Sequence, residues 1–311
     1  MNKPSDILEI RESIFYNEHA KNNIKIAGIG DIHISRLVGE KDINNIYESL
    51  FRENPDYICL LGDLIDSPKE LTIEQSINDL FSLMKNCASI APTMVILGSH
   101  DYDNTKELDL SNEEDIWSEI NKLKDVYVLN DDIYNDNIIT IGGYIQKKEA
   151  YNNPNDIHRE DSLAFYNDFI KHPNLYFELR EDVPKILLTH SPEVIRDSKV
   201  EELLSSYDII ITGHYHNGCV PAMLENIYPK NAGIITPKLR LFPKEARGII
   251  KLDSDTYLIY SGGWIKLSAG SPLLFHPLDM LCNRQMDITT LTSDKEYVEE
   301  VIKTKKLVLK K

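Results

Sequence analysis

The fold of this chain is decided by residues 57–66, which read YICLLGDLID. The apolar run 57–61 is too short for a helix and ends at a turn signal, so it predicts a buried strand. Gly62 lets the chain turn sharply where that strand ends. Asp63 then lies at the carboxyl end of the predicted strand, which is where open α/β sheets place their ligands.

The segments on either side of this stretch have the same organisation. Strands are predicted over 24–33 and 93–97, and helices with apolar residues at helical spacing are predicted over 42–53 and 69–88. Because strands alternate with helices, these segments predict a largely parallel sheet.

The second part of the sequence predicts more strands than helices. Helices are expected over 112–125 and 160–172, and strands over 126–129, 138–144, 185–190, 208–212, 247–252, 256–261 and 286–292. The local pattern leaves residues 7–16 open as strand or helix. No shift in composition marks a domain boundary, so we expect one domain over residues 1–311, with a core over 24–292 and a tail over 293–311.

Composition and charge limit the possible functions. The chain has 311 residues, a hydrophobic content of 42% and a formal net charge of −16, which allow a large core within an acidic protein. An acidic surface repels the phosphates of DNA and RNA, which argues against non-specific nucleic-acid binding. The four cysteines have no CxxC spacing and indicate reduced thiols. Without a signal peptide or an apolar run of about 18 residues, we expect a cytoplasmic protein with no transmembrane segment.

Aspartate or histidine follows five of the predicted strands. These residues are Asp31 and His33, Asp63, His100 and Asp101, His190, and His214 and His216. A single strand-end histidine is commonly a hydrogen-bonded structural residue, and a single aspartate after glycine commonly forms a turn or caps a helix. Five such strand ends in one chain are not explained by independent structural accidents, so we interpret them as one site.

The residue types at these strand ends favour a metal site. Imidazole and carboxylate together suit zinc, iron or manganese, whereas calcium and magnesium prefer oxygen ligands. In an extended chain, Asp31 and His33 would point to the same side, and so would His214 and His216. Two cations about 3.5–4 Å apart lower the pKa of a water between them and offset charge on phosphoryl oxygens. The pattern therefore predicts a binuclear site that activates a hydroxide for attack on phosphorus.

The order and spacing of these motifs resemble those of the calcineurin-like metallophosphoesterases. The motifs are DIH at 31–33, GDLID at 62–66, GSHD at 98–101, THSP at 189–192 and GHYH at 213–216. The set covers roughly residues 24–218. Residues 248–250 and 261–263, together with Pro272, are similar to a bacterial branch of that family.

The resemblance implies an α/β fold, a four-layer α/β/β/α sandwich, in which residues 7–16 form a strand. It implies two divalent metal ions, Mn²⁺, Fe²⁺/Fe³⁺ or Zn²⁺. The first ion would be held by Asp31, His33 and His216, and the second by His190 and His214, with Asp63 bridging the two.

The resemblance also implies a catalytic role for His100. Its imidazole would stabilise or protonate the leaving oxygen while Asp101 holds the ring, because a carboxylate fixes the tautomer and raises the basicity of an imidazole. Asp66 is expected to be structural, as a cap of the next helix.

One position departs from the family pattern. Ser99 stands where the family usually has an asparagine whose carbonyl is a ligand of the second metal. The serine hydroxyl is shorter and a poorer ligand, so we expect the second metal to bind more weakly here, with Ser99 contributing directly or through water.

These observations favour a hydrolase that cleaves a phosphomonoester or phosphodiester. The alternative is a catalytically weak or inactive binding or scaffold protein of the same fold, to which the loss of the asparagine gives some weight. A nuclease is disfavoured by the acidic charge. The proline-containing segment 217–245, with Lys230, Lys238, Arg240 and Lys244, is open as a lid or substrate loop or as a solvated loop.

Overall fold

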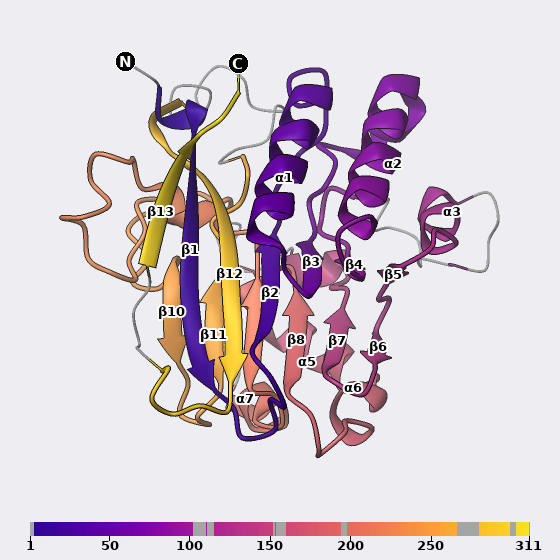
Figure 1. The fold of residues 1–311 in the computed structure, drawn as a ribbon, viewed down its shortest axis with the longest axis vertical. Helices are drawn as coiled ribbons and strands as arrows, with labels where there is room; N and C mark the ends of the chain where they lie inside the picture. The colour runs from indigo at the N-terminus through magenta and orange to yellow at the C-terminus, as the bar shows by residue number, and fades with distance from the viewer. Residues whose placement is uncertain are drawn as a thin grey trace.

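The computed structural model describes residues 3–101, 110, 115–151, 153, 160–193, 198–265, 280–298 and 303–310. Its described part contains two β-sheets (Figure 1). The first has seven strands in the order β13 (Lys303–Val308), β1 (Ile7–Tyr16), β12 (Arg284–Thr292), β2 (Ile24–Ile29), β3 (Tyr57–Leu61), β4 (Thr93–Ile96) and β5 (Val126–Val128). The second has six strands in the order β10 (Gly248–Lys251), β11 (Tyr257–Tyr260), β9 (Ile209–Thr212), β8 (Lys185–Thr189), β7 (Thr140–Tyr144) and β6 (Asp132–Asn135).

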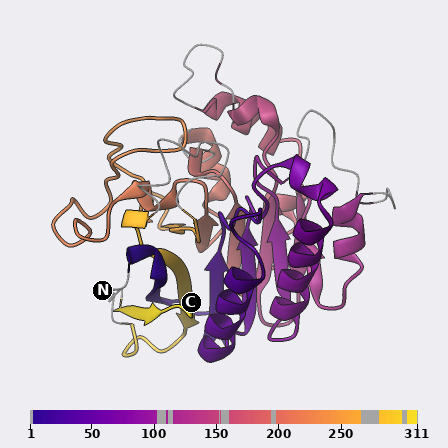
Figure 2. The same cartoon turned by 90° about the horizontal axis from the view of Figure 1, so that it is seen from above.

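Helices lie on the outer faces of the two sheets (Figure 2). The helices are α1 (Glu40–Glu53), α2 (Glu74–Ala88), α3 (Ile116–Asn121), α4 (Lys148–Tyr151), α5 (Ser162–Phe169), α6 (Asn174–Phe177) and α7 (Ser198–Leu204). The buried faces of α1 and α2 belong to the same hydrophobic core as the first sheet. The outer face of the second sheet forms a separate core with α5 and α7, which includes Phe165, Phe169 and Leu204. The predicted four-layer α/β/β/α sandwich is therefore confirmed.

The central strands of both sheets are parallel, as predicted. In the first sheet β2, β3, β4 and β5 pair in parallel register. In the second sheet β7, β8, β9 and β11 do the same. Because parallel neighbours end at the same edge, the carboxyl ends of these strands come together at one end of the sandwich.

Several predicted elements differ from the observed ones. The predicted strand 24–33 ends at Ile29, so Asp31 and His33 lie in the loop that follows. The predicted helix 69–88 is divided into a 3-10 turn (Pro68–Thr72) and α2, which begins at Glu74. The tail was expected to be mixed, but residues 303–308 form β13 and pair with β1 as an edge strand. Strand β6 and the short helices α4, α6 and α7 were not predicted.

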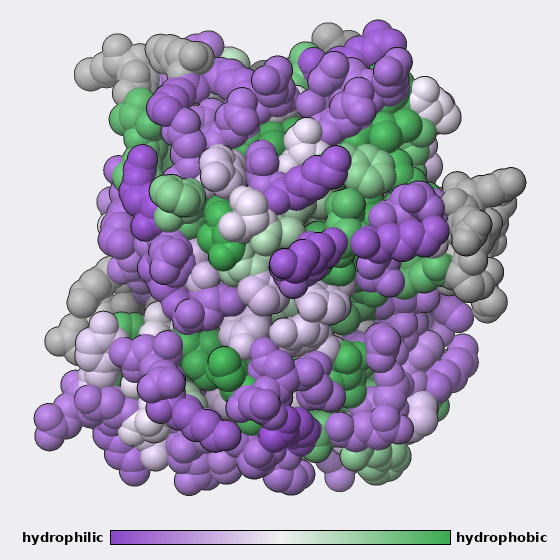
Figure 3. Space-filling model, turned by 45° about the vertical axis from the view of Figure 1, so that its right-hand side comes forward, coloured by the Kyte–Doolittle hydropathy of each residue, from purple (hydrophilic) through white to green (hydrophobic). Residues whose placement is uncertain are grey.

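Some predictions fall on parts of the chain that the structure does not describe. Pro272, residues 111–114 of the predicted helix 112–125 and most of the loop 152–159 lie outside the described residues. In the described residues, no helix is long and apolar enough to cross a membrane. Hydrophilic side chains cover most of the face shown in Figure 3, and apolar ones lie between them in separate small groups.

Candidate metal centre

Two glycines allow the ends of β3 and β4 to approach each other closely. A Cβ on Gly62 would lie 2.6 Å from the backbone nitrogen of Gly98 and 2.8 Å from Nδ1 of His190. A Cβ on Gly98 would lie 2.3 Å from Oδ1 of Asp63. All three distances are under 3.0 Å, which real Cβ atoms essentially never show, so these positions require glycine. The approach places Asp63 beside the loop that carries His100, whose backbone nitrogen donates to Oδ1 of Asp63 at 2.9 Å.

The predicted ligands have an unusual backbone conformation. The φ angles of Asp31, His33, Asp63, His214 and His216 lie between 48° and 67°, in the left-handed region. The expectation that Asp31 and His33, and likewise His214 and His216, stand in extended chain is therefore wrong. Side chains of non-glycine residues are rarely held in this region except where the surrounding structure fixes them, and such residues cluster at functional sites.

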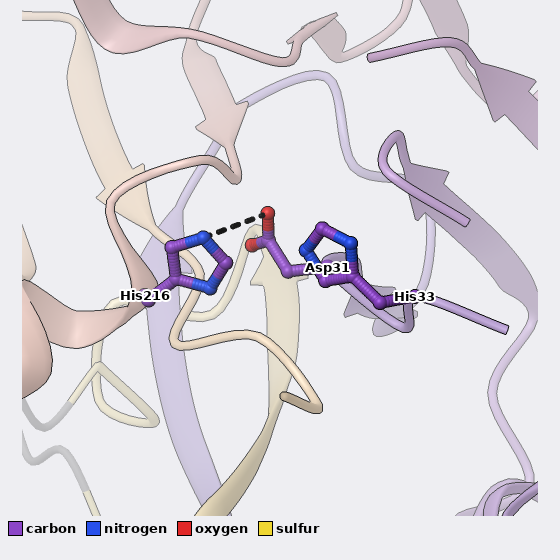
Figure 4. Close-up of side chains that lie close together, drawn as sticks. All are labelled: Asp31, His33 and His216. Atoms are coloured by element: carbon purple, nitrogen blue, oxygen red, sulfur yellow. Dashed lines mark ion pairs between the residues drawn. The ribbon is translucent and has the colours of Figure 1, made fainter. Parts of the chain in front are cut away.

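The first cluster of possible ligands consists of Asp31, His33 and His216 (Figure 4). One ligand atom from each residue lies within 4.8 Å of the others, and all three side chains are buried. Nε2 of His216 is 3.8 Å from Oδ1 of Asp31. The imidazoles of His33 and His216 are stacked with ring centroids 5.7 Å apart. This geometry leaves a nitrogen and carboxylate pocket large enough for one cation.

The second cluster consists of Asp63, His190 and His214, with the same separation between ligand atoms. Nε2 of His190 lies 3.1 Å from Oδ2 of Asp63, and the rings of His190 and His214 are 4.9 Å apart. The two clusters adjoin, because the backbone nitrogen of His214 donates to both oxygens of Asp31, at 3.1 and 3.2 Å. The structure thus brings together all six histidine and aspartate residues expected to hold the two ions.

Hydrogen bonds fix which nitrogen of each imidazole faces its cluster. Nδ1 of His190 lies 2.7 Å from the carbonyl of Leu61, and Nδ1 of His216 lies 2.8 Å from the carbonyl of Ile265. In both residues Nε2 is therefore the available ligand atom. In His214 the two nitrogens exchange roles: Nε2 contacts Glu160, and Nδ1 is the possible ligand atom. Partners of this kind are the usual means by which proteins orient metal-binding histidines.

The charge state of the cluster also suits cation binding. Burial lowers the pKa of His33 well below its ordinary value, which favours the neutral imidazole. Burial alone would raise the pKa of Asp63, but the neighbouring histidines, His190 first among them, lower it well below its usual range. A neutral imidazole and an ionised carboxylate are the forms that metal ions require.

Four buried nitrogens test whether these residues fit metal ions. Both ring nitrogens of His33, Nε2 of His190 and Nδ1 of His214 have no hydrogen-bond partner among the described residues. Leaving a buried polar atom unpaired costs about 1–3 kcal/mol. These orphaned nitrogens converge with two carboxylates, which is the donor set of zinc, iron and manganese sites. The side chains therefore fit divalent metal ions.

His100 lies against the first cluster, with its ring perpendicular to that of His33 at a centroid distance of 5.1 Å. Its Nδ1 lies 2.6 Å from the carbonyl oxygen of Asp66. Burial alone would lower the pKa of His100, but the charge of Asp63 and the Asp66 carbonyl raise it. The ring is thus favoured in its protonated form, which is the form needed to donate a proton.

Asp101 does not hold the His100 ring as expected. Its carboxylate accepts hydrogen bonds from the backbone nitrogens of Gly98 and Leu64, both at 2.7 Å, and of Ile65 at 3.0 Å. Burial raises the pKa of Asp101 to about 7. Asp101 therefore holds the loops after β3 and β4 together. The position beside the His100 ring that was expected for Asp101 is taken by the carbonyl of Asp66.

Ser99 and Asp66 occupy the same loops. Ser99 is half-buried between Gly98 and His100. Asp66 does not cap a helix, because the 3-10 turn that follows has Ser67 at its N-cap and α2 has Ile73. Instead Oδ1 of Asp66 lies 3.6 Å from Nδ1 of His33. Asp66 thus contacts the first cluster through its side chain and His100 through its carbonyl.

Glu160 was not identified from the sequence pattern. Its Oε1 lies 2.6 Å from Nε2 of His214, and both side chains are buried. Burial alone would raise the pKa of Glu160, but the hydrogen bond with His214 lowers it, so the carboxylate is ionised. Glu160 follows a polar loop and no apolar strand, so the pattern that identified the other residues does not apply to it.

Tyr151 and Gln146 complete this layer around the second cluster. The Tyr151 ring contacts His214 at 5.5 Å and His190 at 6.4 Å between centroids. Its hydroxyl donates to Oε1 of Gln146 at 2.7 Å, and the same oxygen accepts from the backbone nitrogen of Ser191. Gln146, Tyr151 and Glu160 therefore form the outer wall of the second cluster.

A family model described as calcineurin-like phosphoesterase matches residues 24–218. The match covers more than half of the chain, so the chain belongs to that family. An uncharacterized metallophosphoesterase of Campylobacter jejuni is 25% identical over 203 residues. That alignment covers 64% of this chain and 45% of the relative, so the chain spans under half the length of the relative. The bacterial relative agrees with the branch expected from residues 248–263.

Two solved structures are more distantly similar. A dimetal phosphatase from Danio rerio has a TM-score of 0.43 and 12% identity, covering 77% of this chain and 87% of that chain. GAP50, the anchor in the inner membrane complex of Plasmodium, has a TM-score of 0.41 and 15% identity. The match covers 94% of this chain and 90% of that chain.

Proposed function

We propose that this metallophosphoesterase hydrolyses a phosphomonoester or phosphodiester with the help of two divalent metal ions. The observation that carries the proposal is the pair of adjoining, buried clusters in which imidazole nitrogens lack partners. The first ion would be held by Asp31, His33 and His216. The second would be held by His190 and His214. Asp63 would be shared by the two ions, and Ser99 would lie at the edge of the second site.

Two such ions would supply an activated water and offset the negative charge on the phosphoryl group. The side chains of the chain itself then bind and orient. Asp63 suits the shared position because its charge acts on His33 in the first cluster as well as on His190 in the second. Glu160, Leu61 and the other partners of the imidazoles hold each ring in the tautomer that offers its free nitrogen inward.

His100 is the proposed proton donor to the leaving oxygen. Its Nδ1 is committed to the Asp66 carbonyl, so Nε2 remains for the substrate. The charge of Asp63 and the Asp66 carbonyl raise the pKa of His100, which favours the form that can donate a proton. Asp101 supports this role indirectly by fixing the loop on which His100 stands.

We further propose that the chain is one metallophosphoesterase domain, with segment 217–245 acting as a substrate loop. Lys238 of this segment lies near enough to Glu160 for its charge to lower the pKa of that carboxylate. Basic residues brought close to the second cluster would attract a phosphate ester.

The direct test is hydrolysis of p-nitrophenyl phosphate and its bis ester, with manganese, zinc or iron added. We expect turnover by the wild type and a loss in kcat of about 10²–10⁴-fold in His100→Ala. In Asp63→Asn we expect both metal binding and activity to be lost. Lys124→Ala is the matched control, because Lys124 is 93% exposed. Preference for either ester would identify the substrate class.

Absence of turnover with every metal, in a protein that still binds two ions, would refute the hydrolase and support the alternative of a scaffold protein of the same fold. Retained activity in His100→Ala would refute the proposed proton donor alone.

A further inference from the structure

A polar cavity of about 610 Å³ lies at the edge of the sandwich, outside the metal centre. It is lined by side chains from β1, β12, β13 and β10, whose places in the fold are labelled in Figure 1, and by five residues between 225 and 231. Among the residues that line it is Asn217, which follows His216, but none of the six ligand residues of the two clusters. Its volume lies in the range of small-molecule sites, which is about 300–1,000 Å³.

The charge of the cavity is opposite to that of the whole chain. Four cationic side chains line it, from Arg11, Lys230, Arg247 and Lys306, against two carboxylates. Arg11 is paired with Asp287 at 2.6 Å and Lys306 lies 3.5 Å from Glu9, so the excess of positive charge comes from Lys230 and Arg247. The complete sequence has 50 acidic and 34 basic residues. A local excess of guanidinium and ammonium groups in an acidic protein selects an anion, and phosphate is the anion that suits both group types.

Arg247 gives the cavity a buried donor that is not used. The residue is 6% exposed. Its Nη2 donates to the carbonyls of Glu225, Tyr228 and Pro229 at 3.0–3.4 Å, which fixes the guanidinium in place. Its Nε has no acceptor in the described parts of the chain, so these side-chain nitrogens bring no carboxylate partner to the guanidinium. Arg247 is therefore a fixed positive charge at the cavity wall, which an anion can approach without reorganising the group.

The remaining lining suits the organic part of a ligand. The carboxylates of Glu9 and Glu225 can accept hydrogen bonds from hydroxyl or amino groups, and Asn226 and Asn231 can donate and accept. The ring of Tyr228 lies 5.9 Å from the Arg247 guanidinium and adds an aromatic surface. A ligand with a phosphate at one end and a polar, flat body would match this set.

We propose that this cavity is a second binding site, separate from the metal centre, for a phosphorylated organic anion of about nucleotide size. Its position gives it contact with the loop after β9. Nη1 of Arg11 donates to Oδ1 of Asn217 at 3.4 Å, and Asn217 has a left-handed backbone directly after His216.

The test is isothermal titration of adenosine monophosphate into the full-length protein with its metals bound. Lys230→Glu is the variant of choice, because this exposed side chain can be changed without disturbing the core. We expect Lys230→Glu to weaken binding about tenfold or more, because it replaces a cation of the cavity wall by a carboxylate that repels the phosphate. Lys124→Glu, a charge reversal at a remote exposed position, should bind as the wild type does.

The Asp63→Asn variant distinguishes nucleotide binding in the cavity from nucleotide binding in the metal centre. Undiminished binding in Asp63→Asn, with loss in Lys230→Glu, would support the proposal and would stand even if hydrolysis were disproved. Binding that disappears in Asp63→Asn and persists in Lys230→Glu would place the nucleotide in the metal centre and overturn the proposal. Equal binding of adenosine would overturn the role of the phosphate, and no binding at millimolar concentration would overturn the site.

Discussion

Replacement of Glu160 by glutamine tests how the second cluster is held. Oε1 of Glu160 lies 2.6 Å from Nε2 of His214, and their side chains are 3% and 5% exposed. Glutamine keeps the size and can still accept a hydrogen bond, but it removes the negative charge that makes the imidazole a better ligand. Loss of such a partner typically weakens metal binding by about 10–100-fold, or roughly 1.4–2.7 kcal/mol.

The assay is competition between metal-free protein and a chromophoric zinc chelator, which resolves a stronger and a weaker site. We expect Glu160→Gln to weaken one of the two sites only, because His216 of the first cluster is oriented by the Ile265 carbonyl. Glu193→Gln is the control, since it removes an equally buried carboxylate that contacts the Tyr215 hydroxyl. Unchanged zinc affinities, or equal losses at both sites, would refute the reasoning.

Three further predictions concern single substitutions. Ser99→Asn supplies a carbonyl ligand and should strengthen binding of the second metal in a calorimetric titration; no gain would contradict the hypothesis of a weakened site. Gly98→Ala places a Cβ 2.3 Å from Oδ1 of Asp63, so we expect a loss of about 1–3 kcal/mol in the free energy of unfolding, measured by urea titration, and impaired metal binding. An unaltered melting curve would show that the loops separate more easily than the structure indicates. Burial raises the pKa of Asp131 to about 7, above its unfolded value near 4. The folded state therefore binds this proton more tightly, and its stabilising effect is lost as the pH rises from 4 through 7. In Asp131→Asn the free energy of unfolding should depend less on pH and should be higher than that of the wild type by on the order of 1–3 kcal/mol at pH 8. An identical pH dependence in both proteins would contradict the assignment.

Sequence reasoning brought together the residues of the proposed metal centre because parallel strands end together. Each short apolar run predicted a buried strand, and the polar residue after it was expected at the common edge. Asp63 and His190 are far apart in sequence and 3.1 Å apart in space for this reason. The same reasoning recovered β3, β4 and β8 with little error, since buried strands have a clear apolar pattern, whereas β1 was expected only from the family resemblance.

The local conformation of the ligands could not be read from the same pattern. Spacing alone suggested extended chain at 31–33 and 214–216, whereas the backbone is left-handed at both. The choice is made by contacts that form only in the folded protein, such as the hydrogen bonds from Asp31 and His33 nitrogens to the carbonyls of Gly62 and Asp63. A single sequence pattern does not contain such tertiary contacts.

Two omissions have different physical causes. Glu160 approaches His214 across 54 positions of sequence, and a contact over that separation forms only in the folded chain. Strand β13, with the sequence KTKKLV, lacks the apolar alternation of a half-buried strand. Lysines are common on edge strands because they prevent further strands from adding to the sheet, and they hide the strand from a search for apolar runs.

The left-handed backbone conformation of the proposed ligands sets the stability of the fold against metal binding. Each non-glycine residue in this region costs on the order of 1 kcal/mol or more, and glycine would relieve that strain. Replacing Asp31 or His216 by glycine would therefore relax the metal-free chain while removing a proposed ligand. Selection for a long-lived protein and selection for a working one would favour different residues at the same positions. Mutants recovered from a screen for heat resistance alone should therefore lose their metal-binding residues at these loops first.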